Sequence, residues 1–123
     1  MSPVIFAIVS VVLSAMAQLA LKSGMSAPGI QGVIRSGDGI PQILVAASSN
    51  GMVIIGFALY AIGAGVWLLV LGRWEVSKAY PFVGLGFVMT MVFGAALLGE
   101  RITPERAFGT LLVLGGVLLV GRT

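Results

Sequence analysis

Four long apolar stretches dominate the pattern of this 123-residue chain. The first runs over Val4–Leu21 without a charged residue and ends at Lys22. The other three are Met52–Leu71, Ala79–Leu98 and Pro104–Val120, and an arginine or glutamate follows each within two residues. Helices of this length match the hydrocarbon core of a bilayer, about 30 Å thick. The pattern therefore predicts four transmembrane helices.

Capping signals set the expected boundaries of these helices. Ser2-Pro3 and Thr103-Pro104 each combine a capping residue with a proline suited to the first helical turn. Strands would leave backbone groups unpaired in lipid, so each span must be α-helical. We predict an all-α, polytopic membrane protein with one transmembrane domain and spans at about 3–22, 50–72, 79–99 and 104–121.

The connections differ in length. Segment 23–49 is the one long connection, and the abundance of Gly, Ser and Pro in its first half predicts a loop. Pro41–Ala47 is apolar enough for an interfacial helix or for an early extension of the second span. The dipeptide Tyr80-Pro81 predicts either a helix start or a kink, because a residue before proline avoids helical geometry. Basic residues divide four to three between the two sides, which leaves the membrane orientation open.

Composition narrows the function classes. Hydrophobic residues make up 59% of the chain and charged residues 9%, far fewer charges than a water-soluble domain carries. The chain has no cysteine and no histidine, so we expect no metal and no organic cofactor. The formal charge of +3 comes from residues at the ends of apolar stretches, where they meet lipid headgroups rather than nucleic acid. No phosphate loop or nucleophile–base pair indicates an enzyme.

A row of polar residues follows one face of the first predicted span. Ser10, Ser14 and Gln18 are spaced four residues apart, and Lys22 continues the row. A polar stripe on a membrane helix should face protein or water. It either forms hydrogen bonds between helices or lines a polar path that ends at Lys22. Tyr80 is a further neutral polar residue within a span.

Glycines mark a surface of close helix approach on the fourth predicted span. Gly109 and Gly116 are seven residues apart and share one face, where neighbouring backbones can approach closely. Four helices alone enclose little space. We therefore predict a dimer.

Five separated motifs resemble the drug/metabolite transporter superfamily. They are SAMAQLALK (14–22), WLLVL (67–71), VSKAYPFVGLGFV (76–88), GERITPERAFG (99–109) and GGVLLVG (115–121). The small multidrug resistance exporters of this superfamily carry a glutamate in the first helix, where this chain has Ser14, and an aromatic residue where it has Val83. Their dimer-forming seven-residue glycine spacing in the last helix is matched by Gly109 and Gly116, so the resemblance implies that these two glycines lie at a dimer interface. The chain is more similar to the short EamA-like branch, which includes flippase subunits for undecaprenyl phosphate-linked aminoarabinose.

This resemblance implies a flippase subunit in the bacterial inner membrane. The expected substrate is a polyprenyl (undecaprenyl) phosphate-linked sugar such as aminoarabinose, used for lipid A modification. The chain would act as a homodimer or as a heterodimer with a related subunit. The residues expected to bind substrate are Ser10, Ser14, Gln18, Lys22, Tyr80, Arg101 and Arg106, with the basic side chains contacting the phosphate.

Two other functions stay open. The chain is alternatively an exporter of small cations or metabolites, which would have to use Glu100, the carboxylate near the end of the third span. It is otherwise a non-transporting membrane partner of an enzyme of envelope synthesis.

Overall fold

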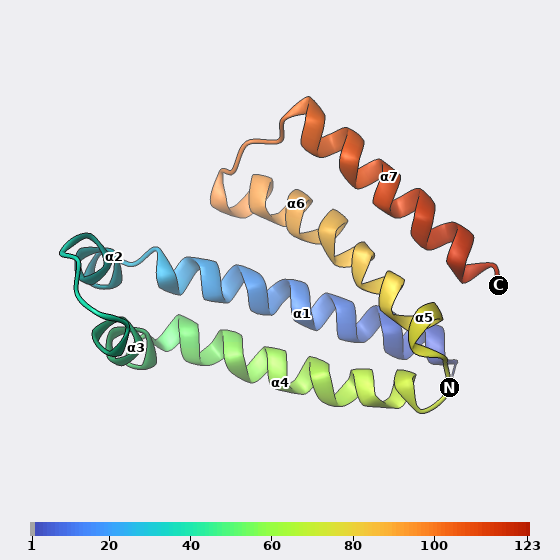
Figure 1. Cartoon of the computed structure of the whole chain (residues 1–123), viewed down its shortest axis with the longest axis horizontal. Coiled ribbons are helices and arrows are strands. Elements are labelled where there is room, and N and C mark those ends of the chain that lie inside the picture. Colours follow the sequence, from blue (N-terminus) through green and yellow to red (C-terminus); the bar gives the residue numbers. More distant parts are fainter. Residues whose placement is uncertain (1) are drawn as a thin grey trace.

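The computed structural model describes residues 2–123, and the part of the chain that it describes is all-α (Figure 1). The helices are α1 (Pro3–Met25), α2 (Pro28–Arg35), α3 (Ile40–Ser48), α4 (Gly51–Leu71), α5 (Val76–Ala79), the 3-10 turn η1 (Tyr80–Val83), α6 (Gly84–Leu98) and α7 (Pro104–Gly121). Within residues 2–123, four helical stretches are long and apolar enough to cross a membrane: α1, α4, Val76–Leu98 and α7.

Helices α1 and α4 form a tight antiparallel pair (Figure 1). Glycines on α4 permit the close approach: a Cβ at Gly56 would lie 2.7 Å from Leu21 Cγ and 3.0 Å from the Leu21 backbone nitrogen. At the start of α4, the Asn50 side chain accepts hydrogen bonds from the amides of Met52 (3.0 Å) and Val53 (3.1 Å). This close approach of α1 and α4 is the most extensive helix–helix packing in the described part of the chain.

The third span begins earlier than the sequence suggests and is interrupted near its start. It runs from Val76, through the 3-10 turn at Tyr80–Val83, to Leu98. Tyr80 keeps a helical backbone (φ −61°, ψ −39°) although a proline follows it. Pro81 has no amide hydrogen and cannot donate the hydrogen bond that a regular α-helical turn needs, so the chain forms a tighter 3-10 turn here. The dipeptide therefore marks an irregular turn inside a longer helical segment.

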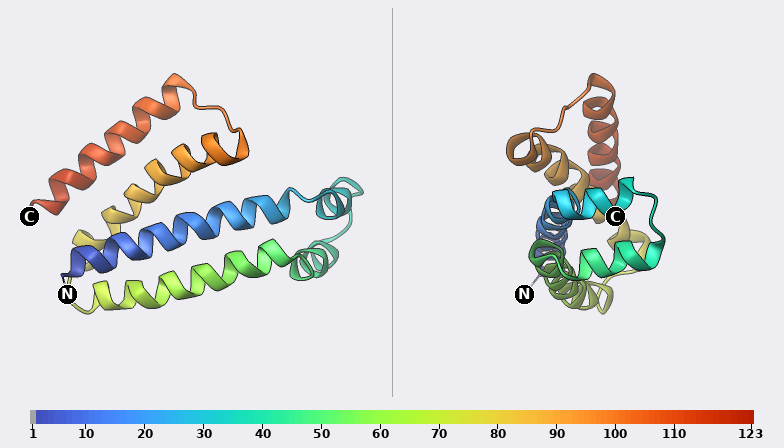
Figure 2. Two further views of the ribbon diagram at one scale, coloured as in Figure 1. Left: turned by 180° about the vertical axis from the view of Figure 1, so that it is seen from behind. Right: turned by 90° about the vertical axis from the view of Figure 1, so that its left-hand side faces the viewer.

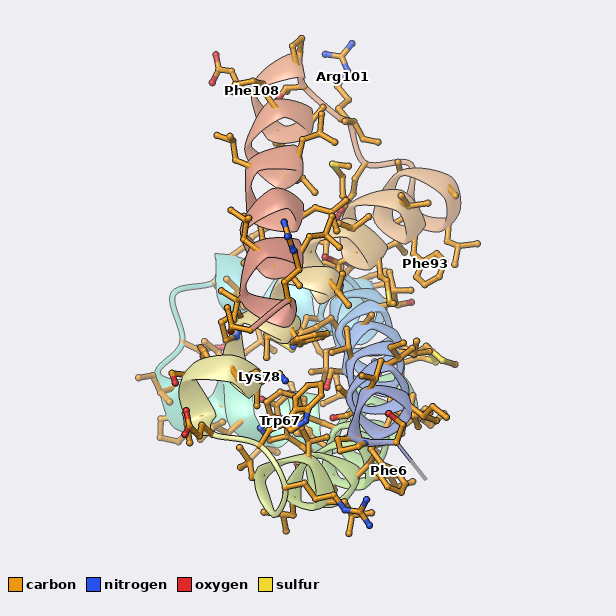
Figure 3. All side chains as sticks on the ribbon, turned by 90° about the vertical axis from the view of Figure 1, so that its right-hand side faces the viewer. Phe6, Trp67, Lys78, Phe93, Arg101 and Phe108 are labelled. Carbon is orange, nitrogen blue, oxygen red and sulfur yellow. The ribbon has the colours of Figure 1, made fainter. Side chains whose placement is uncertain are left out.

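An aromatic cluster joins this span to the α1–α4 pair. Ala7, Val70 and Ala79 are buried at its centre, and the partly buried side chains of Phe6, Trp67, Trp74 and Phe82 pack around them. The ring centroids of Trp74 and Phe82 are 5.2 Å apart, and Lys78 Nζ lies 4.7 Å from the Trp74 ring centroid. Trp67 and Lys78 lie at this end of the molecule (Figure 3).

The expected loop in the first half of segment 23–49 is wrong, because residues 28–35 form α2. Pro28 occupies the first turn, where its missing amide hydrogen costs nothing, and Ile30 is buried. The Gln31 side chain donates a hydrogen bond to the Met25 carbonyl at 2.7 Å, which anchors α2 to the end of α1. Helices α2 and α3 lie across one end of the α1–α4 pair (Figure 2).

The α6–α7 hairpin diverges from the α1–α4 pair. Helix α6 starts beside the amino-terminal half of α1 and moves away from it toward Leu98 (Figure 1). Helix α7 packs on α6 where Gly84 meets Val113 and Val117. Most large apolar side chains of α7 are exposed, and Val117 is the buried one in this helix. These exposed faces suit lipid or another protein chain.

We expect the substitution Gly56→Ala to destabilise the protein by about 1–3 kcal/mol, because the added methyl group collides with Leu21 between α1 and α4. The measurement is the free energy of unfolding in detergent micelles. Gly65→Ala is the matched control, since an added Cβ at Gly65 on the same helix has no atom within 4 Å. Equal stability of the two variants would contradict the close packing at Gly56.

Candidate functional site

A groove of about 620 Å³ lies where α6 diverges from the α1–α4 pair. Its walls come from α1, α4 and the third span, and Glu100 lies at its edge. The polar side chains that line it are Ser10, Ser14, Gln18, Lys22, Tyr60, Tyr80, Thr90 and Glu100. The remaining lining is mostly apolar, with Trp67 and Phe87 as its largest side chains. A groove of this composition accommodates a molecule with both polar and apolar parts.

The polar row on α1 faces this groove, but its members differ in availability. Ser10 is 3% exposed, and its hydroxyl donates a hydrogen bond to the Gly63 carbonyl at 2.8 Å. Ser10 therefore joins α1 to α4. Ser14 is half-buried beside Gly63, whereas Gln18 and Lys22 are exposed. The polarity available to a bound molecule increases along α1 toward Lys22.

The other walls of the groove add the phenolic hydroxyl groups of two tyrosines. Tyr80 and Tyr60 are exposed and border the groove from η1 and α4. Thr90 Oγ1 donates to the Gly86 carbonyl at 2.8 Å, so this hydroxyl is bonded within its own helix. The two tyrosines are the neutral polar groups of these walls that remain free to meet a ligand.

Arg101 and Arg106 lie in a separate, smaller groove of about 290 Å³ between α6 and α7. Arg106 Nη1 donates to the Arg101 carbonyl at 3.0 Å, and the Arg106 amide donates to the capping Thr103 hydroxyl at 3.1 Å. The Arg101 side chain points outward at the far side of the hairpin (Figure 3). The structure thus brings Lys22 and Tyr80 to one groove and the two arginines to another.

Glu100 borders both grooves. The sequence singled it out for the exporter alternative but not among the residues expected to bind the lipid-linked sugar. Its position follows from the end of α6: Gly99 adopts a left-handed conformation (φ 70°), and the Glu100 amide donates to the Gly94 carbonyl at 3.1 Å. This turn directs the carboxylate back over Gly94, where an added Cβ would lie 2.5 Å from Glu100 Oε1. A glycine directly after an apolar helix is the sequence signal for such a left-handed turn.

The predicted interface glycines lie away from both grooves. An added Cβ at Gly109 or Gly116 has no atom within 4 Å. Packing within the described chain therefore gives no reason for glycine at these two positions. Residues 2–123 also contain no group of three or more acidic side chains able to hold a metal ion.

Comparison with known proteins gives a family match over nearly the whole chain. The EamA-like transporter family matches residues 1–122. A probable 4-amino-4-deoxy-L-arabinose-phosphoundecaprenol flippase subunit ArnE of Pseudomonas fluorescens (strain Pf0-1) is 46% identical over 67 residues, which cover 53% of this chain and 59% of that protein. The protein of the same description from Pseudomonas savastanoi pv. phaseolicola is 38% identical over 82 residues, 67% of this chain and 71% of that protein.

A third protein with this description, from Pseudomonas aeruginosa (strain UCBPP-PA14), is 40% identical over 68 residues, 54% of this chain and 59% of that protein. The chain thus spans less than two thirds of the length of several of these relatives. No solved structure matches the chain.

We expect Ser10→Ala to lower the free energy of unfolding in micelles by about 0.5–1.5 kcal/mol, because it removes a buried hydrogen bond between α1 and α4. Ser14→Ala is the matched control on the same face of α1, since the Ser14 side chain forms no hydrogen bond with the described residues. A larger loss of stability in the Ser14 variant would overturn this assignment of roles.

Proposed function

We propose, from the premise that the chain belongs to the EamA-like transporter family, that it is a subunit of a membrane flippase. Its substrate is a polyprenyl (undecaprenyl) phosphate-linked sugar such as aminoarabinose, which it moves across the bacterial inner membrane for lipid A modification. The chain acts as a multi-pass transporter and not as an enzyme. The relatives named as probable flippase subunits support this choice of substrate.

The observation that carries the proposal is the groove that combines Lys22 with neutral polar groups between apolar helices. A lipid-linked sugar has an anionic phosphate, a polar sugar and a long apolar tail. Lys22, at the interface end of α1, supplies positive charge for the phosphate. Gln18, Tyr60 and Tyr80 supply hydrogen-bonding groups for the sugar.

The lateral openness of the fold suits the tail of such a substrate. Helix α6 moves away from α1 toward its carboxyl-terminal end (Figure 1), and the groove lies between these two helices and α4. A polyprenyl chain is as apolar as the lipid around it, so it can remain in the bilayer while the head occupies the groove. This division avoids burying the tail inside a four-helix protein.

The arginines take a secondary place in this proposal. Arg101 and Arg106 line the smaller groove, which shares Glu100, Phe87 and Thr90 with the larger one. We assign them to the headgroup region at the same end of the molecule, where they raise the local concentration of anionic lipid. Ser10 belongs to the wall of the groove as a positioning residue for α1 and α4.

A partner chain associates with α7 in this proposal. Helix α7 presents Gly109 and Gly116, which line neither groove and have no neighbour inside the described chain. Paired helices with such small residues approach closely in membranes. We propose that this face of α7 meets the corresponding helix of a second copy or of a related subunit.

Export of small cations or metabolites is the second candidate function, because the Glu100 carboxylate borders the groove. Position 14 holds serine, so the interior of the first helix has no carboxylate to exchange protons for cations. Resistance to a cationic compound that depends on this chain, and that Glu100→Gln abolishes, would favour export over lipid flipping.

We expect Lys22→Ala to reduce the exchange of a polyprenyl phosphate-linked sugar between leaflets by about tenfold, because a charge-assisted contact with the phosphate is lost. The measurement is headgroup accessibility in liposomes that contain the purified protein. Lys22→Arg should retain most of the exchange, since it keeps the charge. Arg35→Ala on α2, outside both grooves, is the control for net charge. Full exchange by Lys22→Ala would remove Lys22 from the site.

We expect Gly116→Leu to weaken association of the chain by about tenfold or more, because a large side chain separates the paired α7 helices. The measurement is the dissociation constant in detergent micelles, from energy transfer between labelled chains. Gly115→Leu is the matched control, since Gly115 is equally free of neighbours but lies about 100° around the helix. Unchanged association of Gly116→Leu would argue against this interface.

A further inference from the structure

One of the four acidic residues of the chain lines the large groove, and it is Glu100. Asp38, Glu75 and Glu105 contribute to neither groove. The carboxyl-terminal ends of α1 and α6 lie at the same end of the molecule (Figure 1), and both Lys22, in the last turn of α1, and Glu100, two residues after α6, line the groove. The groove therefore carries one positive and one negative side chain.

The position of Glu100 is electrostatically unfavourable for an anion. The last carbonyl groups of a helix lack partners within it and give the carboxyl-terminal end a partial negative charge. Glu100 follows the end of α6 directly, and the left-handed Gly99 turns it back over the last two turns of the helix. Carboxylate and helix end thus add their negative potentials at one place, and a cation there would be stabilised by both.

No cation of residues 2–123 neutralises this position. Lys22 lines the same groove but forms no ion pair with Glu100. Arg106 Nη1 donates to the Arg101 carbonyl instead of to the carboxylate, and the Arg101 side chain points outward. The Glu100 side chain is exposed and accepts no hydrogen bond from the described residues. Its carboxylate is therefore accessible to water and to a ligand in the groove.

We infer that Glu100 is a specificity-determining residue that binds the ammonium group of the substrate head while Lys22 binds its phosphate. The inference rests on the proposed function and deepens it: it assigns one residue of the groove to the free primary amine of the proposed amino-sugar head and another to the phosphate. A neutral sugar on the same lipid satisfies Lys22 and leaves Glu100 without a partner. Acylation of the amine removes its positive charge and has the same effect, so the groove selects free amino sugars.

The test compares two lipids that differ in one charge. One lipid is a polyprenyl phosphate that carries an amino sugar, and the other is the same lipid with the amine acetylated. Binding to the purified protein in micelles is followed by the fluorescence of Trp67, which lines the groove. We expect wild type to bind the free amine about tenfold more tightly. Glu100→Gln should lose this preference and bind both lipids as wild type binds the acetylated one. Lys22→Ala should weaken both equally.

Two further variants separate recognition from structure. Gly94→Ala keeps Glu100, but the new methyl group displaces the end of its flexible side chain, so the preference for the free amine should fall while the fold persists. Glu105→Gln removes a carboxylate five residues away that lines neither groove, and the preference should stay unchanged. Stability of each variant is measured in the same micelles.

Phosphatidylethanolamine tests the other source of the same chemistry, since its head also joins a phosphate to a primary amine. Competition by this lipid that Glu100→Gln abolishes would support the ammonium site and extend it to membrane phospholipids. Competition that Glu100→Gln leaves intact would overturn the inference.

The outcomes distinguish the inference from its premise. Equal binding of the two amino-sugar lipids by wild type, or equal weakening of both by Glu100→Gln, would overturn the role of Glu100 and leave the flippase proposal standing. Failure of wild type to bind either lipid would overturn the proposed function and the inference with it.

Discussion

The packing of the aromatic cluster at one end of the molecule is the constraint on which the site depends. Phe82 and Trp74 hold the start of the third span against Ala7 of α1 and Val70 of α4. Because this is the end where the span is fixed, α6 is free to diverge from α1 along the rest of its length (Figure 2). In lipid there is no hydrophobic force to close the resulting space, since the tails solvate apolar side chains as well as another helix does. A laterally open groove is the direct consequence.

Polar groups within the bilayer are divided between structure and site. Ser10 and Thr90 use their hydroxyls on backbone carbonyls, which satisfies them inside the apolar region. Gln18, Lys22 and Tyr80 lie in the groove and keep their hydrogen-bonding capacity for water or a ligand. The same polar row on α1 therefore serves helix association at Ser10 and access to solvent at Lys22. The four-residue spacing accounts for both roles, because it places the side chains on one face of α1 and sets each one a helical turn further along the groove.

Features set by local periodicity were predictable from the sequence, and features set by turns were not. The four apolar helices and the shared face from Ser10 to Lys22 follow from the helical repeat, which needs no knowledge of the fold. Segment 28–35 was expected to be a loop because its glycines disfavour a helix. The burial of Ile30, which stabilises α2, depends on contacts with other parts of the fold and cannot be seen in the local sequence. The return of Glu100 over Gly94 requires the left-handed Gly99, and the separation of Arg101 from Lys22 requires the divergence of α6. The proposed dimer and the individual binding roles stay predictions.

The 3-10 turn at Tyr80–Val83 has a mechanical consequence. The turn lies between the aromatic cluster, where the third span packs against α1 and α4, and the part of α6 that diverges from α1. The 15 residues of α6 extend about 22 Å from this turn. A rotation of about 10° at this turn would move the far end of α6, which Glu100 follows, by about 4 Å. The width of the groove near the end of α6 is therefore sensitive to the backbone angles around Pro81.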